Sequence, residues 1–207
     1  GIYLLPNLFT TASLFAGFYA IVQAMNFRFG QAAVAIFVAM VLDGLDGRVA
    51  RLTRTQSAFG AEYDSLSDMV SFGAAPALIV YEWALKGMGN LGWIAAFVYV
   101  AGAALRLARF NVMLDVADKR WFTGIPSPAA AALVAGLVWI IDDYNIDPIG
   151  LKWWVWVVTV FAGLTMVSNV PYYSFKTINL KKSVPFLAIF VVVLVIALLS
   201  YQPALVL

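Results

Sequence analysis

The chain has 207 residues, of which 63% are hydrophobic and only 12% are charged. A soluble domain is about 25% charged, so this composition excludes an ordinary soluble domain and indicates an integral membrane protein. There is no Cys and no His, and the net charge is only +2. Disulfides, zinc–thiolate sites and Ser-His-Asp chemistry are therefore excluded, and any metal must be held by oxygen atoms, as Mg²⁺, Mn²⁺ and Ca²⁺ are. The small net charge does not suggest nucleic-acid binding, and we expect none.

Seven apolar segments are candidates for membrane-spanning helices, which need about 20 mostly apolar residues. In chain order they cover residues 8–25, 31–51, 61–85, 91–113, 127–141, 149–168 and 184–200. Pro76 lies inside the third segment and predicts a kink there. We therefore expect an all-α integral membrane protein with no soluble domain.

The basic residues predict the orientation of these helices. If the seven segments alternate in direction, one side holds the start of the chain and residues 48–60, 106–126 and 169–183. Ten of the thirteen basic residues lie on that side, namely Arg48, Arg51, Arg54, Arg106, Arg109, Lys119, Arg120, Lys176, Lys181 and Lys182. The positive-inside rule places this side in the cytoplasm. We expect a multi-pass protein of the cell (inner or plasma) membrane.

Four aspartates flank the connection between the second and third segments. Asp43 and Asp46 are three residues apart and share one helix face, while Asp64 and Asp68 are four apart and share a face of the next helix. The short connection makes the two helices antiparallel neighbours, so the carboxylates can converge. An Asp deep in a membrane helix costs about 2.5–3.5 kcal/mol on insertion scales, so such a cluster needs a compensating partner.

Divalent cations are the expected partner. Four carboxylates suit two cations, and two metals about 3.5–4 Å apart are a known arrangement for phosphoryl chemistry. Gly47, Ala50 and Gly60 leave space beside the carboxylates, and Arg51 can hold a phosphate with its planar fork. These features indicate a nucleotide or pyrophosphate ligand. The alternative is that the charges are helix ends at the membrane interface and that the small residues pack helix against helix.

The whole stretch reads Asp43-x2-Asp46-Gly47-x2-Ala50-Arg51-x8-Gly60-x3-Asp64-x3-Asp68, with eight fixed positions over 26 residues. It resembles the signature of the CDP-alcohol phosphatidyltransferase family without any departure. The resemblance implies a homodimeric membrane enzyme with a six-helix core, which moves a phosphatidyl group from CDP-diacylglycerol to an alcohol and releases CMP. Residues 1–183 would then form the transmembrane core, and residues 184–207 an additional C-terminal transmembrane helix.

The same resemblance implies roles for individual residues. Asp43, Asp46, Asp64 and Asp68 would bind two divalent cations (Mg²⁺ or Mn²⁺, or Ca²⁺), and Asp68 would also be the general base. The residues that would bind the CDP moiety are Asn7, Thr10, Gly47, Arg51, Ser57 and Gly60. For Asn7, a plain helix cap is the alternative reading.

Further segments resemble the integral-membrane phosphatidylserine synthases. They are LPNLFTTASLFAGFYAI, YDSLSDMVSFGAAPA, RLARFNV, FTGIPSPAAAA and VSNVPYYSFK. The implied acceptor is L-serine, and the expected reaction is a direct displacement without a covalent enzyme intermediate. Such synthases often carry eight helices, whereas seven are expected here. Glycerol 3-phosphate or inositol phosphate stays open as the acceptor, because sister enzymes use them.

Arg106 and Arg109 lie three residues apart at the cytoplasmic end of the fourth segment. With Asn111 and Ser127, they are candidates to hold the lipid phosphate or the serine carboxylate. The alternatives are that the arginines meet anionic lipid head groups at the interface, and that Ser127 simply caps its helix.

Two other classes of function stay open. A divalent-cation transporter would place its ligands near the middle of the membrane, whereas the four aspartates cluster at one cytoplasmic end. A purely structural membrane protein would leave the clustered aspartates without a purpose.

Overall fold

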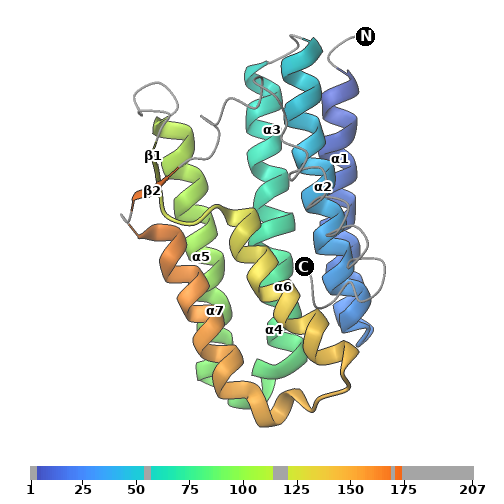
Figure 1. Cartoon of the computed structure of the whole chain (residues 1–207), viewed down its shortest axis with the longest axis vertical. Helices are drawn as coiled ribbons and strands as arrows, with labels where there is room; N and C mark the ends of the chain where they lie inside the picture. Colours follow the sequence, from blue (N-terminus) through green and yellow to red (C-terminus); the bar gives the residue numbers. More distant parts are fainter. Residues whose placement is uncertain (1–3, 54–56, 114–120, 169–170, 174–207) are drawn as a thin grey trace, which may run out of the picture.

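The computed structural model describes residues 4–53, 57–113, 121–168 and 171–173, which form a bundle of helices packed lengthwise (Figure 1). Five uninterrupted helices are α1 (Leu4–Met25), α2 (Phe29–Thr53), α5 (Asn90–Met113), α6 (Ser127–Asp143) and α7 (Lys152–Val167). Short 3₁₀ turns at Lys86–Met88 and Pro148–Leu151 precede α5 and α7.

The remaining helix, third in chain order, is built from several pieces without a break. It runs through α3 (Ala58–Asp68), a π-helical turn (Met69–Ala74), α4 (Ala75–Val80) and a second π-helical turn (Tyr81–Leu85). The six helices of the described residues confirm the expected all-α architecture, and their ends lie within a few residues of the predicted ones. The seventh expected helix, at 184–200, lies outside the described residues.

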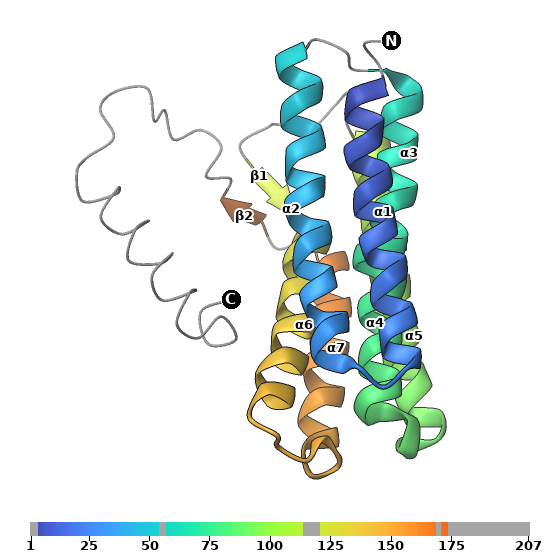
Figure 2. The same ribbon diagram turned by 90° about the vertical axis from the view of Figure 1, so that its right-hand side faces the viewer.

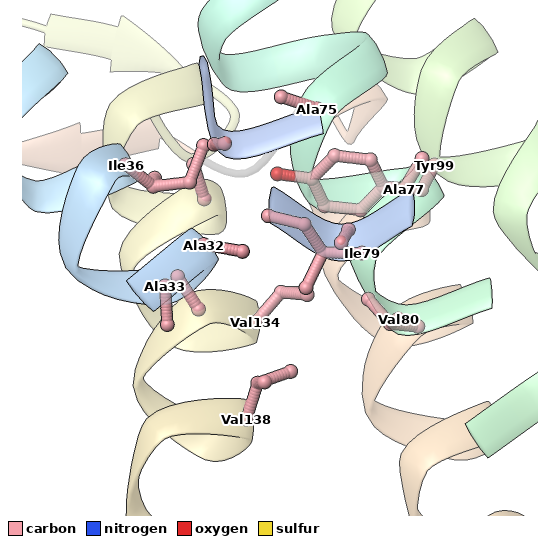
Figure 3. Close-up of a cluster of buried hydrophobic side chains, with 14 of the residues drawn as sticks. Ala32, Ala33, Ile36, Ala75, Ala77, Ile79, Val80, Tyr99, Val134 and Val138 are labelled. Carbon is pink, nitrogen blue, oxygen red and sulfur yellow. The ribbon is translucent and has the colours of Figure 1, made fainter. Parts of the chain in front are cut away.

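The bundle has the surface and interior of a membrane protein. Three helical stretches are long and apolar enough to cross a membrane, at Asn7–Met25, Asn90–Val112 and Pro148–Val167. Large apolar side chains point outward, among them Phe15, Phe18 and Trp154, which are each more than half exposed. The buried core is mostly alanine, joined by a few larger residues such as Ile36 and Ile79 (Figure 3). Small residues inside and large ones outside suit a bilayer, in which helices associate by close packing.

Helix α1 lies between α2 and the composite third helix (Figure 2). The Ser13 hydroxyl donates to the Ala39 carbonyl of α2 at 3.0 Å, and the Ser71 hydroxyl donates to the Ser13 carbonyl at 3.1 Å. A Cβ at Gly17 would collide with Ser71, so this crossing requires glycine. Helix α1 therefore sets the separation between the two helices that carry the aspartates.

The π-helical turn precedes Pro76, where the sequence predicts a kink. Proline has no N–H, so Pro76 cannot donate to the carbonyl of Phe72 four residues earlier. The hydroxyl of Tyr99, a fully buried residue of α5, donates to that carbonyl at 3.0 Å. Tyr99 thus satisfies a buried acceptor that the proline leaves open, and it ties α5 to the third helix.

One feature departs from the expected all-helical chain. Strands β1 (Trp121–Thr123) and β2 (Pro171–Tyr173) form a short antiparallel pair in which Phe122 is opposite Tyr172. Both strands are rich in aromatic or β-branched residues, which favour extended backbone, but three residues are too few for a recognisable alternation. The pair links the chain before α6 to the chain after α7.

We expect Tyr99→Phe to destabilise the bundle by about 1–3 kcal/mol, because it removes the side-chain donor of the Phe72 carbonyl beside Pro76. Thermal unfolding in detergent micelles measures this change. The matched control is Tyr19→Phe, since Tyr19 is 42% exposed. Equal unfolding temperatures for the two variants would contradict this role of the Tyr99 hydroxyl.

Candidate functional site

Three of the four aspartates come together between α2 and α3. One carboxylate oxygen from each of Asp43, Asp64 and Asp68 lies within 4.8 Å of the others. Asp43 comes from α2, while Asp64 and Asp68 lie one turn apart on α3, so the two helices present their carboxylates to the same space. These three residues are called the carboxylate cluster below.

The fourth aspartate is held slightly apart. Asp46 is buried, and its Oδ2 accepts a hydrogen bond of 2.7 Å from the Thr10 hydroxyl of α1. It still lies close enough to Asp64 for the two carboxylates to interact electrostatically. All four carboxylates were expected to lie together. The structure clusters three of them, while the hydrogen bond from Thr10 turns the carboxylate of Asp46 toward α1.

Helix α1 also contacts α3 beside the cluster. The Ser67 hydroxyl donates to the backbone carbonyl of Thr10 at 3.2 Å, so Thr10 bonds to α2 through its side chain and to α3 through its backbone. One turn away, Thr11 and Tyr63 share a hydrogen bond of 2.9 Å between their hydroxyls. These bonds fix the two helix faces that carry the carboxylates.

The residues of the cluster fit a bound divalent cation. Asp64 Oδ1 and Asp68 Oδ1 are buried and have no hydrogen-bond partner among the described residues. A buried carboxylate oxygen without a partner is costly, and it is the ligand atom that Mg²⁺, Mn²⁺ and Ca²⁺ prefer. The donor set contains oxygen only, which agrees with the absence of Cys and His from the sequence.

Several residues expected to bind the nucleotide lie together at one end of the cluster. Ser57 caps α3, its hydroxyl accepting from the Gly60 N–H at 3.0 Å. A Cβ at Gly60 would lie 3.1 Å from Ser57 Oγ and 3.5 Å from Asn7 Oδ1, so these three residues are neighbours. Helix α1 begins at Leu4, so Asn7 is inside the helix and the alternative of a plain cap is wrong.

Gly47 and Arg51 lie one turn apart near the end of α2. A Cβ at Gly47 would be 3.5 Å from Nη1 of Arg51, so the guanidinium lies over the glycine. Arg51 is exposed and interacts electrostatically with Asp46. Gly47 has no side chain to block access to the exposed guanidinium of Arg51. An anionic group that approaches the cluster from this end can therefore bind to Arg51.

A second cationic group approaches from α5. Arg106 Nη1 donates to the hydroxyl of Ser127 at 3.3 Å, and the guanidinium interacts electrostatically with Asp68. Ser127 is fully buried at the first position of α6, and Pro126 occupies the cap position, so the expectation of a Ser127 cap is wrong. Arg109 lies one turn further along α5 and is half-buried.

Asn111 lies on α5 but bonds to α3. Its side-chain amide exchanges hydrogen bonds with the Ser65 hydroxyl, at 3.1 and 3.2 Å. Asn111 was expected to act with the arginines, whereas Ser65, Thr11 and Tyr63 were not foreseen as part of the site. These bonds join residues that are 46 and 52 positions apart, and no local spacing indicates such a pair.

Comparisons with known proteins agree with this geometry. The family described as CDP-alcohol phosphatidyltransferase matches residues 3–166.

Three relatives carry the name CDP-diacylglycerol–serine O-phosphatidyltransferase. The Helicobacter pylori protein is 42% identical over 187 residues, covering 87% of this chain and 77% of the relative. The Mycobacterium leprae protein is 35% identical over 203 residues, covering 93% and 65%. The Methanocaldococcus jannaschii protein is 40% identical over 137 residues, covering 66% and 61%.

The family match extends over most of the chain and includes α1 to α7, with the carboxylate cluster among the matched residues. This chain is a transferase that belongs to the CDP-alcohol phosphatidyltransferase family.

Proposed function

We propose that this chain transfers a phosphatidyl group from CDP-diacylglycerol to L-serine, giving phosphatidylserine and CMP. The observation that carries the proposal is the carboxylate cluster of a member of this family, in which two buried oxygens have no hydrogen-bond partner among the described residues. The names of the relatives support L-serine as the acceptor.

The four aspartates would hold two divalent cations, Mg²⁺ or Mn²⁺. When bound, such cations neutralise charge on the pyrophosphate and on the oxygens that attack and leave. Asp43, Asp64 and Asp68 supply the clustered oxygens, and Asp46 supplies a fourth carboxylate from beside Thr10. The Thr10 hydroxyl would orient Asp46, so in this proposal Thr10 acts through the aspartate.

The CDP moiety would bind at the end of the cluster where α2 ends and α3 begins. Arg51 would hold a phosphate, and Gly47 leaves the surface beneath it open. Asn7, Ser57 and Gly60 lie together at the start of α3, where their polar atoms could contact the cytidine or ribose.

The chemistry is an in-line displacement at the phosphorus that carries diacylglycerol. The serine hydroxyl oxygen forms a new bond to this phosphorus while the bond to the CMP oxygen breaks, and CMP leaves with that oxygen. Asp68 accepts the hydroxyl proton as the bond forms and later releases it to water. A carboxylate that also binds a cation is a weak base, so positioning of the two substrates must supply much of the rate.

We place this site at the cytoplasmic face, because ten of the thirteen basic residues fall on that side. Residues 1–183 would form the catalytic core and residues 184–207 an additional transmembrane helix. Assembly as a homodimer is proposed from the family resemblance.

The first test measures CMP release by purified protein with CDP-diacylglycerol and Mn²⁺. Parallel reactions contain L-serine, glycerol 3-phosphate, inositol phosphate or no acceptor. We expect fast release with L-serine alone. Release with a phosphorylated acceptor in place of L-serine would keep the family and overturn the choice of acceptor.

Removal of divalent cations is expected to abolish CMP release, and added Mg²⁺ or Mn²⁺ to restore it. A cation at about 100 times its Kd stabilises the folded state by about 2.7 kcal/mol, so Mn²⁺ should also raise the unfolding temperature. This shift should be lost in Asp64→Asn and kept in Asp143→Asn, an exposed position at the other end of the bundle. Full activity in excess chelator would contradict the metal site.

Asp68→Asn should lower the rate of CMP release with L-serine by about 10²–10⁴-fold, because it removes the proposed base. Asp143→Asn serves as the control and should keep the wild-type rate. Size-exclusion profiles in detergent check that both variants are folded. An Asp68→Asn protein with a nearly normal rate would refute the role of this carboxylate.

A further inference from the structure

We infer that the guanidinium of Arg106, anchored by Ser127, binds the carboxylate of the acceptor amino acid. This inference rests on the proposed function and adds to it the group that recognises the acceptor. It also separates Arg106 from the residues that bind the CDP-diacylglycerol phosphates.

The first observation is an unused donor edge on Arg106. The Nη1 atom donates to the Ser127 hydroxyl at 3.3 Å, whereas Nε is buried and has no hydrogen-bond partner among the residues that the structure describes. Within the described ranges, no carboxylate lies at ion-pair distance from Arg106. The side chain of Arg106 is half-buried, but a buried N–H such as that of Nε is costly to leave without an acceptor. The planar fork of arginine matches a carboxylate, which can accept two parallel hydrogen bonds.

The second observation concerns the groups that surround the Arg106 guanidinium. Ser127 is fully buried, so the Nη1 contact anchors one end of the half-buried guanidinium to a buried group. Helix α6 begins at Ser127, has 17 residues and carries no side-chain cap at its N-terminus. The positive end of its dipole therefore adds to the charge of Arg106. Both features favour a small anion at the junction of α5 and α6.

The third observation is that the two arginines interact with different carboxylates. Arg106 interacts electrostatically with Asp68, the proposed base, whereas Arg51 interacts with Asp46. The two cations thus accompany different carboxylates, one on α3 and the other on α2. An in-line displacement needs the attacking oxygen and the leaving CMP on opposite sides of the phosphorus. Because the hydroxyl and carboxylate of serine are separated by only two carbon atoms, a carboxylate on Arg106 brings the hydroxyl toward Asp68.

The test compares two acceptors that differ only in this group. L-serine has a carboxylate where serinol (2-amino-1,3-propanediol) has a hydroxymethyl group. We measure kcat/KM for each by CMP release, in the wild type, Arg106→Gln and the control Arg28→Gln. Arg28 is an exposed arginine between α1 and α2, at the opposite end of these helices from the aspartates.

We expect Arg106→Gln to reduce the preference for L-serine over serinol by about 10- to 100-fold, as for the loss of charged hydrogen bonds. The loss should come from a higher KM for L-serine, with little change in the KM for CDP-diacylglycerol. Arg28→Gln should keep both values. Ser127→Ala should change the preference in the same direction but less, and it carries the test if Arg106→Gln does not fold.

Three results would overturn the inference. If Arg106→Gln slows both acceptors equally, Arg106 only offsets the charge of Asp68. If it raises the KM for CDP-diacylglycerol instead, Arg106 binds a lipid phosphate. A wild type that releases CMP with glycerol 3-phosphate and not with L-serine would overturn the proposed function, and this inference with it. The wild-type reactions distinguish that failure from the other two.

Discussion

Repulsion among three carboxylates inside an apolar bundle is the constraint on which the rest of this structure depends. Two like charges about 4 Å apart repel by about 4 kcal/mol at an effective dielectric constant of about 20. Asp43, Asp64 and Asp68 hold oxygens within 4.8 Å of one another, and the carboxylates come from two separate helices. Without other contacts, α2 and α3 would relieve the repulsion by moving apart. The fold must therefore hold these helices in place and leave the charge available to cations.

Helix α1 supplies this restraint through polar bonds and small residues. Thr10 bonds to Asp46 of α2 and accepts from Ser67 of α3, and Ser13 takes part in a second pair of bonds one turn below. In a membrane such bonds replace part of the hydrophobic driving force that soluble helices use. Their position near the aspartates means that the same contacts stabilise the bundle and orient the site.

The sequence predicted those features that depend on local spacing. The helix ends were found within a few residues because a membrane demands long apolar stretches, and Asp43, Asp64 and Asp68 were expected to share facing helix surfaces. The bonds of Thr10 to Asp46 and of Tyr99 to Phe72 were not foreseen, since they join residues 36 and 27 positions apart. The short strands β1 and β2 were also missed. They follow α5 and α7, and three residues each are too few to show the alternating pattern of a strand in the sequence.

The two arginines near the aspartates differ in exposure, and this difference suits the two sides of a displacement. Arg51 lies exposed at the end of α2, where solvent and salt screen its charge. A screened contact holds an anion weakly, which in the proposed reaction would favour the departure of CMP after the bond breaks. Arg106 is anchored to a fully buried serine, so its charge is screened less and its geometry is fixed. In the proposed reaction the acceptor must be oriented before it attacks. A fixed donor such as Arg106 would lower the barrier most for this group, because a preorganised donor needs no rearrangement as the reaction proceeds.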